Sequence, residues 1–189
     1  MKKKKMIRRL FIYNFVIILL IMIVKVIYTN ENIVIKEIAY KEPSSTPNKV
    51  EIVWDGLTMD ELTERLNKNL YNELSGTGKY FAEYTAKTGM DPYLAVSIVN
   101  LETGCKWKCS YLARNCYNIG GLKGKPSCNG GAYAKYDSLE DGINSYLNIL
   151  YKGYWSKGLD TAEKMNKKYA ESTSWAEKVN RYYETIKAS

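Results

Sequence analysis

The chain has 189 residues, of which 28 are lysine or arginine and 20 are aspartate or glutamate, giving a formal net charge of +8. Seven of the basic residues and no acidic residue fall within the first 29 positions, so the rest of the chain has a net charge of only +1. A nucleic-acid-binding domain carries its basic surface on the folded part, so this distribution argues against one. The chain has no histidine, which excludes Ser-His and Cys-His nucleophile systems and leaves carboxylates and tyrosines as candidate catalytic groups.

The N-terminal segment carries a membrane-targeting pattern. Residues 1–9 form a basic tail, and residues 10–28 form an apolar run that only Asn14 and Lys25 interrupt. A helix needs about 20 residues to cross a bilayer, and the run reaches that length when the Lys25 ammonium extends to the interface. We predict an uncleaved single-pass signal anchor over residues 10–28. It would place the protein in the cell membrane, with residues 1–9 in the cytoplasm and the folded domain outside the cell.

A cleaved secretory signal peptide is the alternative, because it also begins with basic residues followed by a short apolar core. No small-x-small cleavage site follows the run, however, and the sequence there is Tyr28-Thr29-Asn30-Glu31. Residues 29–56 combine a short β-like run with a Pro-, Ser- and Thr-containing stretch typical of linkers. We interpret them as a stalk between the anchor and one folded domain over residues 57–189, a length that suits a single domain.

Apolar periodicity and capping residues predict helices through most of this domain. The capping box of Thr58 and Glu61 predicts the start of the first helix. Four leucines at intervals of four residues predict that this helix extends to Leu74. The later helices are indicated in chain order by a stop at Gly89, a cap at Asp91 with a stop at Gly104, a start at Ser138 with Asp141, a span of roughly 161–169, and a cap at Ser174 with Glu177. The stretch from Cys105 to Tyr136 is rich in Gly, Cys and Asn and suits loops with a small hairpin. The sequence thus predicts a mainly α fold of the α+β type, a helical domain with a small irregular or β-hairpin lobe.

The predicted helix between Asp91 and Gly104 brings a carboxylic acid to its end. Asp91 suits the N-cap, and Gly104 supplies the left-handed stop. Leu94, Ile98 and Glu102 recur at every fourth residue, so Glu102 is expected to continue the buried face of the helix. A carboxyl group at such a position can give a proton to a leaving oxygen. The alternative is a side chain of the last turn that points out to solvent.

All four cysteines lie in the predicted lobe. A tetrathiolate zinc site is one interpretation, but the C-x3-C-x6-C-x11-C spacing lacks the paired C-x2-C knuckles of common zinc sites. Outside the cell, disulfides are the expected state. We therefore predict two disulfides, with the pairing left open by the spacing, and neither a metal nor a cofactor. The cysteines concerned are Cys105, Cys109, Cys116 and Cys128.

Four motifs, taken in order, resemble a known family. They are Pro92-Tyr93-Leu94-Ala95-Val96 with Leu101-Glu102-Thr103-Gly104, Asn118-Ile119-Gly120-Gly121-Leu122-Lys123-Gly124, Tyr133 with Tyr136-Asp137-Ser138, and Tyr169-Ala170 with Trp175-Ala176-Glu177-Lys178-Val179. Together they are similar to the glucosaminidase family of bacterial cell-wall hydrolases, which belongs to the lysozyme-like superfamily. The resemblance covers residues 88–183. It implies a lysozyme-like domain, with its lobe beside the active-site cleft, that cleaves β-1,4 bonds in the glycan strands of peptidoglycan.

The resemblance also implies roles for individual residues. Glu102 matches the family's general acid, and Tyr169 matches its active-site tyrosine. The expected substrate-binding positions, from the loop beneath the cleft and from stacking against sugars, are Asn118, Gly120, Gly121, Tyr133 and Tyr136. Tight-turn geometry and hairpin packing are the structural alternatives for these five residues.

The sequence departs from the family where some members carry a second carboxylate on a β-hairpin. Residues 125–132, between the Gly-rich and aromatic motifs, contain no acid, and Glu140 and Asp141 beyond them suit the first turn of a helix. A single acid can act with the acetamido group of the substrate, or as acid and then base in a lytic transglycosylase. We expect an endo-β-N-acetylglucosaminidase whose partners are peptidoglycan strands and the membrane, with no nucleic acid. A lytic transglycosylase or muramidase, and a non-catalytic wall-binding scaffold of an envelope-spanning apparatus, are the alternatives.

Overall fold

The computed structural model describes residues 22, 23, 25 and 51–189. The chain divides into two units, Met1–Lys49 and Val50–Ser189, and in the first unit the three described residues are helical. The rest of the predicted anchor over residues 10–28, and the predicted stalk up to residue 50, lie outside the described residues. Among the described residues, no helix combines the length and the apolar character that crossing a bilayer requires.

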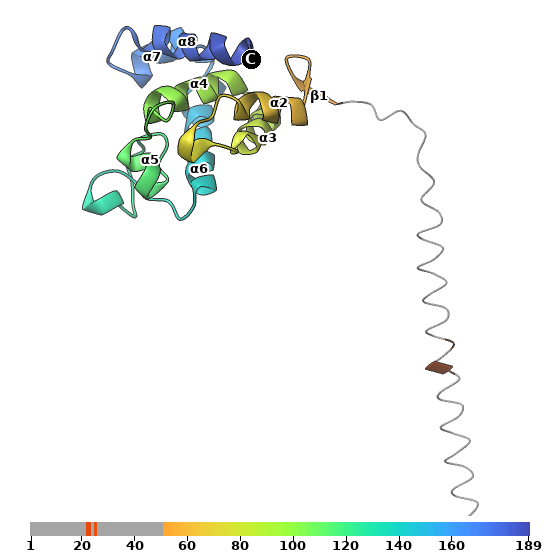
Figure 1. Cartoon of the computed structure of the whole chain (residues 1–189). Coiled ribbons are helices and arrows are strands. Elements are labelled where there is room, and N and C mark those ends of the chain that lie inside the picture. The colour runs from red at the N-terminus through yellow and green to blue at the C-terminus, as the bar shows by residue number, and fades with distance from the viewer. Residues whose placement is uncertain (1–21, 24, 26–50) are drawn as a thin grey trace, which may run out of the picture. The chain divides into compact units, whose positions relative to one another are not determined.

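The second unit is mainly helical and is built around α4 (Pro92–Thr103). In Figure 1, α8 (Trp175–Lys187) lies along one side of α4, while α2 (Met59–Asn67) and α3 (Gly78–Thr88) lie on the other. Helix α6 (Leu139–Gly153) packs against α3. The apolar faces of these helices form one core.

The predicted ends of α4 are confirmed. The Oδ1 atom of Asp91 accepts hydrogen bonds from the backbone N–H groups of Tyr93 at 2.8 Å and Leu94 at 3.1 Å. These two donors begin the helix and have no partner within it. Gly104 ends the helix in the left-handed conformation, with φ 66°.

The prediction that Glu102 continues a buried stripe is wrong. Residues 92–100 are all buried, so α4 is covered on every side and its four-residue spacing does not single out one face. In the last turn the helix reaches the surface, where Leu101 is half-buried and Glu102 is exposed. The end of the helix, and not one of its faces, positions the acid.

A small hairpin precedes α2. Strands β1 (Ile52–Trp54) and β2 (Leu57–Thr58) pair antiparallel. The turn residues Asp55 and Gly56 both have positive φ, 47° and 77°, as short hairpins with a right-handed twist require. Trp54 packs edge-on against Tyr93 with ring centroids 6.4 Å apart. Strand β1, which falls in the segment predicted as stalk, is thereby part of the folded domain.

Helix α2 has the predicted capping box of Thr58 and Glu61, but it is shorter than predicted. It ends at Asn67, whose side-chain oxygen accepts a hydrogen bond from the backbone N–H of Gly78 at 2.7 Å. The chain then turns into the short 3-10 helix η1 (Asn72–Leu74). The hydrogen bond to Asn67 gives a partner to the first N–H group of α3, which has none within that helix. Leu62, Leu66, Leu70 and Leu74 are nevertheless all buried.

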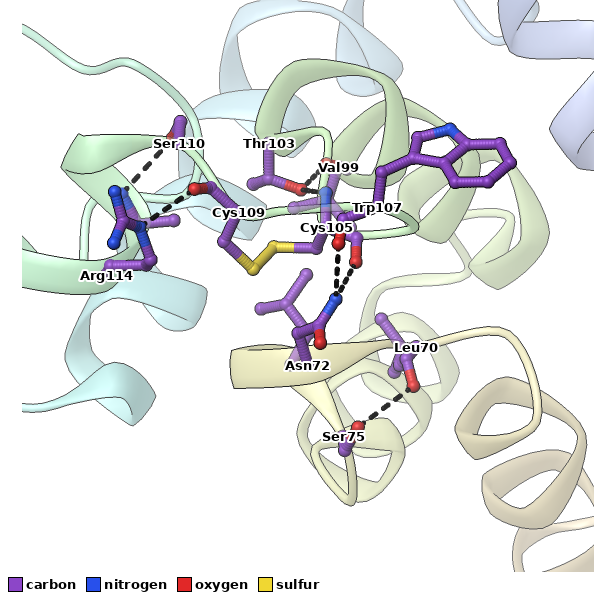
Figure 2. The surroundings of a disulfide bond; sticks show 12 residues. Leu70, Asn72, Ser75, Val99, Thr103, Cys105, Trp107, Cys109, Ser110 and Arg114 are labelled. Atoms are coloured by element: carbon purple, nitrogen blue, oxygen red, sulfur yellow. Dashed lines mark hydrogen bonds between the residues drawn. A yellow bond between two sulfur atoms is a disulfide. The ribbon is translucent and has the colours of Figure 1, made fainter.

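The lobe between α4 and α6 combines a short helix, tight turns and two disulfides. It contains α5 (Tyr111–Cys116) and the 3-10 helix η2 (Cys128–Gly130), with isolated antiparallel bridges pairing Lys123 with Tyr133 and Ser127 with Ala134. The two predicted disulfides are present. Cys105 pairs with Cys109, and Cys116 pairs with Cys128. Figure 2 shows the first of them, beneath the end of α4.

The C-terminal part runs through η3 (Trp155–Lys157) and α7 (Ala162–Tyr169) into α8. The predicted N-cap Ser138 accepts a hydrogen bond from a backbone N–H group, as expected, and Thr161 caps α7 in the same way. The predicted cap at Ser174 is wrong, because its side chain makes no capping hydrogen bond. Its hydroxyl instead pairs with the hydroxyl of Ser172 at 3.0 Å.

Candidate active site

The acid at the end of α4 is held by an indole from α8. The Nε1–H of Trp175 donates a hydrogen bond to Oε1 of Glu102 at 3.1 Å. Among residues 51–189 this carboxyl group accepts no other hydrogen bond, so Oε2 is available to a ligand. Because Trp175 is 5% exposed, its N–H needs a protein partner. Glu102 supplies that partner.

An aromatic stack fixes the position of this indole. The ring of Trp175 stacks on that of Tyr169 with centroids 4.6 Å apart and planes inclined by 26°. Tyr154 packs against Tyr169 as well, with the two ring centroids 5.3 Å apart. The junction of α7 and α8 therefore orients the carboxyl group that α4 delivers.

A cleft of about 230 Å³ opens beside the acid. Its lining includes one carboxylate, three tyrosines and backbone from the Gly-rich loop. The residues are Glu102, Gly120, Leu122, Tyr146, Ile149, Leu150, Tyr154 and Tyr169. The structure thus brings together three residues predicted for the site, namely Glu102, Tyr169 and Gly120.

The floor of the cleft depends on a close contact between Gly120 and Tyr146. A Cβ atom on Gly120 would lie 2.9 Å from the Tyr146 ring, closer than atoms can pack without movement. The Tyr146 ring is itself fixed, since it is 2% exposed and its hydroxyl donates a hydrogen bond to the carbonyl of Ala95 at 2.8 Å. Glycine at position 120 lets the loop approach this ring and leaves the cleft open.

The tyrosines of the cleft are neutral. Burial raises the pKa of the Tyr169 phenol well above its ordinary value, and the nearby Glu102 carboxylate raises it further. Burial also raises the pKa of Tyr146, with smaller contributions from Tyr169 and Glu102. Both phenols therefore keep their protons, and Glu102 is the one carboxylic acid among the residues that line the cleft.

Asn118 organises the loop that borders the cleft. Its Nδ2 donates to the carbonyls of Leu122 and Ala134, both at 2.8 Å, and its Oδ1 accepts from the N–H of Leu122 at 2.9 Å. The side chain is buried. These bonds join the Gly-rich loop to the lobe, and Gly121 supports the same turn with φ 61°. The structure places neither Asn118 nor Gly121 among the residues that line the cleft.

The two tyrosines predicted to stack on sugars lie on the lobe. Tyr133 is 42% exposed, and its backbone forms an antiparallel β-bridge with that of Lys123. Tyr136 is half-buried and donates its backbone N–H to the carbonyl of Cys116. Neither lines the cleft beside Glu102. Asp141 accepts a hydrogen bond from the Ser138 hydroxyl at 2.6 Å in the first turn of α6. The helix dipole stabilises a negative charge at this position.

Sequence reasoning assigned no role to Trp175 or Tyr154, although both contribute to the site. The buried indole had one usable signal, since a tryptophan that packs inside a domain must find an acceptor for its N–H. The acceptor is 73 residues away in the sequence, so no local pattern identifies it.

The described residues contain one group of possible metal ligands, formed by Glu73, Cys105 and Cys109. The two sulfurs are joined to each other. Zinc binds cysteine as the thiolate, so these residues do not fit a zinc site in the oxidised protein.

Comparison with known proteins agrees with this geometry. The family model for glucosaminidase, described as mannosyl-glycoprotein endo-beta-N-acetylglucosaminidase, matches residues 78–188. That span contains α3 to α8 and every residue lining the cleft. No curated protein matches the chain. The chain belongs to the glucosaminidase family, and its domain is a glycoside hydrolase that acts on glycan strands.

Proposed function

We propose that this protein is a membrane-anchored peptidoglycan hydrolase, an endo-β-N-acetylglucosaminidase with Glu102 as its general acid. The observation that carries the proposal is the Glu102 carboxyl group, which accepts a hydrogen bond from the Trp175 indole at Oε1 and lines the cleft. Cleavage of a glycoside needs such an acid, because the departing oxygen must receive a proton as the C1–O bond breaks.

The second group of the reaction comes from the substrate in this proposal. Glu102 is the single carboxylate lining the cleft, whereas most glycosidases use two. The carbonyl oxygen of the substrate's 2-acetamido group can bond to C1 as the C1–O bond breaks, and Glu102 gives its proton to the leaving oxygen. Water then attacks C1, the carbonyl oxygen leaves, and Glu102 takes the water's proton. Charge and protons balance, and the acid is restored.

Tyr169 suits the task of orienting this acetamido group. Its phenol lines the cleft beside Glu102 and stays protonated, so it can donate a hydrogen bond but cannot act as a base near neutral pH. Exchange of Tyr169 for phenylalanine would then lower kcat while the Trp175 ring keeps its stacking partner. A fully active Tyr169→Phe variant would exclude this role.

The mass of the products tests the proposal as a whole. Each residue of the core lies between positions 53 and 186, so a fragment of residues 50–189 contains the entire core. This fragment and its Glu102→Gln variant are incubated with purified peptidoglycan, and the released fragments are weighed. Reducing N-acetylglucosamine ends from the parent and none from the variant are expected. Reducing muramic acid ends, 1,6-anhydromuramic ends or no cleavage would each refute the proposed bond specificity, and no cleavage would refute the enzyme.

The membrane anchor is supported by the basic tail and the apolar run of residues 10–28. A short tether would confine cleavage to wall close to the membrane and favour local remodelling. Protease added outside intact cells should digest the domain while an epitope ahead of residue 10 stays protected. Release of the domain into the medium with a new N-terminus near residue 30 would instead identify a cleaved signal peptide.

A further inference from the structure

A second groove lies beside the C-terminal end of α4, next to Leu101. Its volume is about 330 Å³, and its walls come from the loop after α4 and from α8. Two aromatic rings and three cationic side chains line it. They are Trp107, Tyr182, Lys106, Lys178 and Arg181.

The indole of Trp107 is held out to solvent by a braced turn. It is 82% exposed, and Figure 2 shows it pointing away from the Cys105–Cys109 disulfide that closes the turn. The side-chain amide of Asn72 donates to the carbonyls of Cys105 and Trp107. A ring that is so little packed contributes little to the core. A flat ring with two side-chain torsions loses little entropy when a ligand stacks on it.

The groove is positively charged. The ammonium group of Lys106 lies 5.9 Å from the ring centre of Trp107 and 5.8 Å from that of Tyr182, so it joins the turn to α8. Arg181 forms an ion pair with Glu177. Lys106 and Lys178 take part in none of the ion pairs found within residues 51–189. Their two charges are therefore available to an anionic ligand.

The groove and the active-site cleft lie at the same end of α4. Leu101, in its wall, is the neighbour of Glu102 in the last turn of α4. On α8, Lys178 and Tyr182 follow Trp175 by three and seven residues, which places all three on one face of the helix. A polymer bound at Glu102 that runs along α8 toward its C-terminal end would reach Tyr182 and Trp107.

We propose that this groove binds the same glycan strand as the cleft, at a sugar that carries a stem peptide. Trp107 and Tyr182 stack on the pyranose ring, and Lys106 and Lys178 pair with the free carboxylates of the peptide. The inference rests on the proposed function, since it takes peptidoglycan as the substrate. It adds that the enzyme prefers strands with charged peptides over neutral glycan.

Binding is measured with the Glu102→Gln form of residues 50–189, which cannot cleave. The ligands are soluble peptidoglycan strands freed of phosphate-containing wall polymers, and the same strands with their carboxylates converted to methylamides. Trp107→Ala should weaken binding to native strands on the order of tenfold, the loss typical of a central tryptophan, and Trp107→Phe should restore most of it. Unchanged melting temperatures exclude unfolding as the cause.

Methylamidation should weaken binding of the parent and leave binding of Lys106→Ala/Lys178→Ala unchanged. Lys79→Ala/Lys87→Ala, on α3, removes the same charge elsewhere and should behave as the parent. Equal affinity of Trp107→Ala and the parent would overturn the proposal. The proposal would also be overturned if methylamidation weakened binding of Lys106→Ala/Lys178→Ala as much as binding of the parent. The same holds if binding depended on charge only before the phosphate-containing polymers were removed.

The outcome is separable from that of the proposed function, which is read from cleavage by the unsubstituted fragment. If Trp107→Ala cleaves as fast as the parent at limiting substrate, the proposed role of the groove is refuted and the proposed hydrolase activity stands. If Trp107→Ala binds more weakly but the unsubstituted fragment shows no cleavage, the groove is supported as a binding site and the proposed hydrolase activity is refuted.

Discussion

Exchange of Trp175 for phenylalanine tests whether the indole N–H prepares Glu102 for catalysis. The substitution keeps an aromatic ring against Tyr169 but deletes the hydrogen bond to Oε1 of Glu102. As Glu102 releases its proton in the transition state, it gains negative charge, so the N–H bond becomes stronger there than in the ground state. A hydrogen bond to a charged group contributes about 1.5–3 kcal/mol. Taking the lower limit, kcat should fall about tenfold.

The assay is the rate of release of reducing ends from peptidoglycan, with kcat and KM determined separately. We expect the loss in kcat with little change in KM, because Trp175 does not line the cleft. Trp155→Phe is the matched control, since it removes a half-buried indole at the start of η3 without touching Glu102. A kcat within twofold of the parent for Trp175→Phe, or an equal loss in the control, would refute the reasoning.

Three further predictions concern the cleft and its lobe. Gly120→Ala would place a methyl group 2.9 Å from the Tyr146 ring, so we expect a loss of about 1–3 kcal/mol in stability and a raised KM; an unchanged melting curve and KM would contradict this. Replacing Cys116 and Cys128 by serine opens a disulfide with a sequence separation of 12 and should lower the free energy of unfolding by about 2–3 kcal/mol, measured by urea titration against the parent. Because the pKa of Tyr169 lies above its ordinary value, its phenol should stay protonated as the pH rises past about 10. The alkaline limb of kcat should therefore be the same in Tyr169→Phe as in the parent, and a limb that only the parent shows would count against the raised pKa.

The helix boundaries that depend on local chemistry could be predicted from the sequence. Asp91 and Gly104 bound α4 because their side-chain and backbone preferences act over a few residues. The same holds for the capping box of Thr58 and Glu61. Ser174 failed as a cap because a second serine, two residues earlier, competes for its hydroxyl.

The burial of α4 and the surroundings of its acid could not be predicted in this way. A helix enclosed by others shows apolar residues on all faces, so periodicity does not locate its exposed end. The hydrogen bond between Trp175 and Glu102, and the contact between Gly120 and Tyr146, join segments that are far apart in sequence. Only the packing of the helices brings these residues together. The same applies to the pairing of the four cysteines, which depends on the path of the lobe.

The hairpin before α2 has a practical consequence for handling the domain. Trp54 contacts Tyr93 near the start of α4, while Glu102 lies nine residues further along the same helix, about 14 Å along its axis. A purification tag or a surface linkage joined ahead of residue 51 therefore starts at the far end of α4 from the acid. Immobilising the domain through its N-terminus should leave the cleft accessible to long, insoluble glycan.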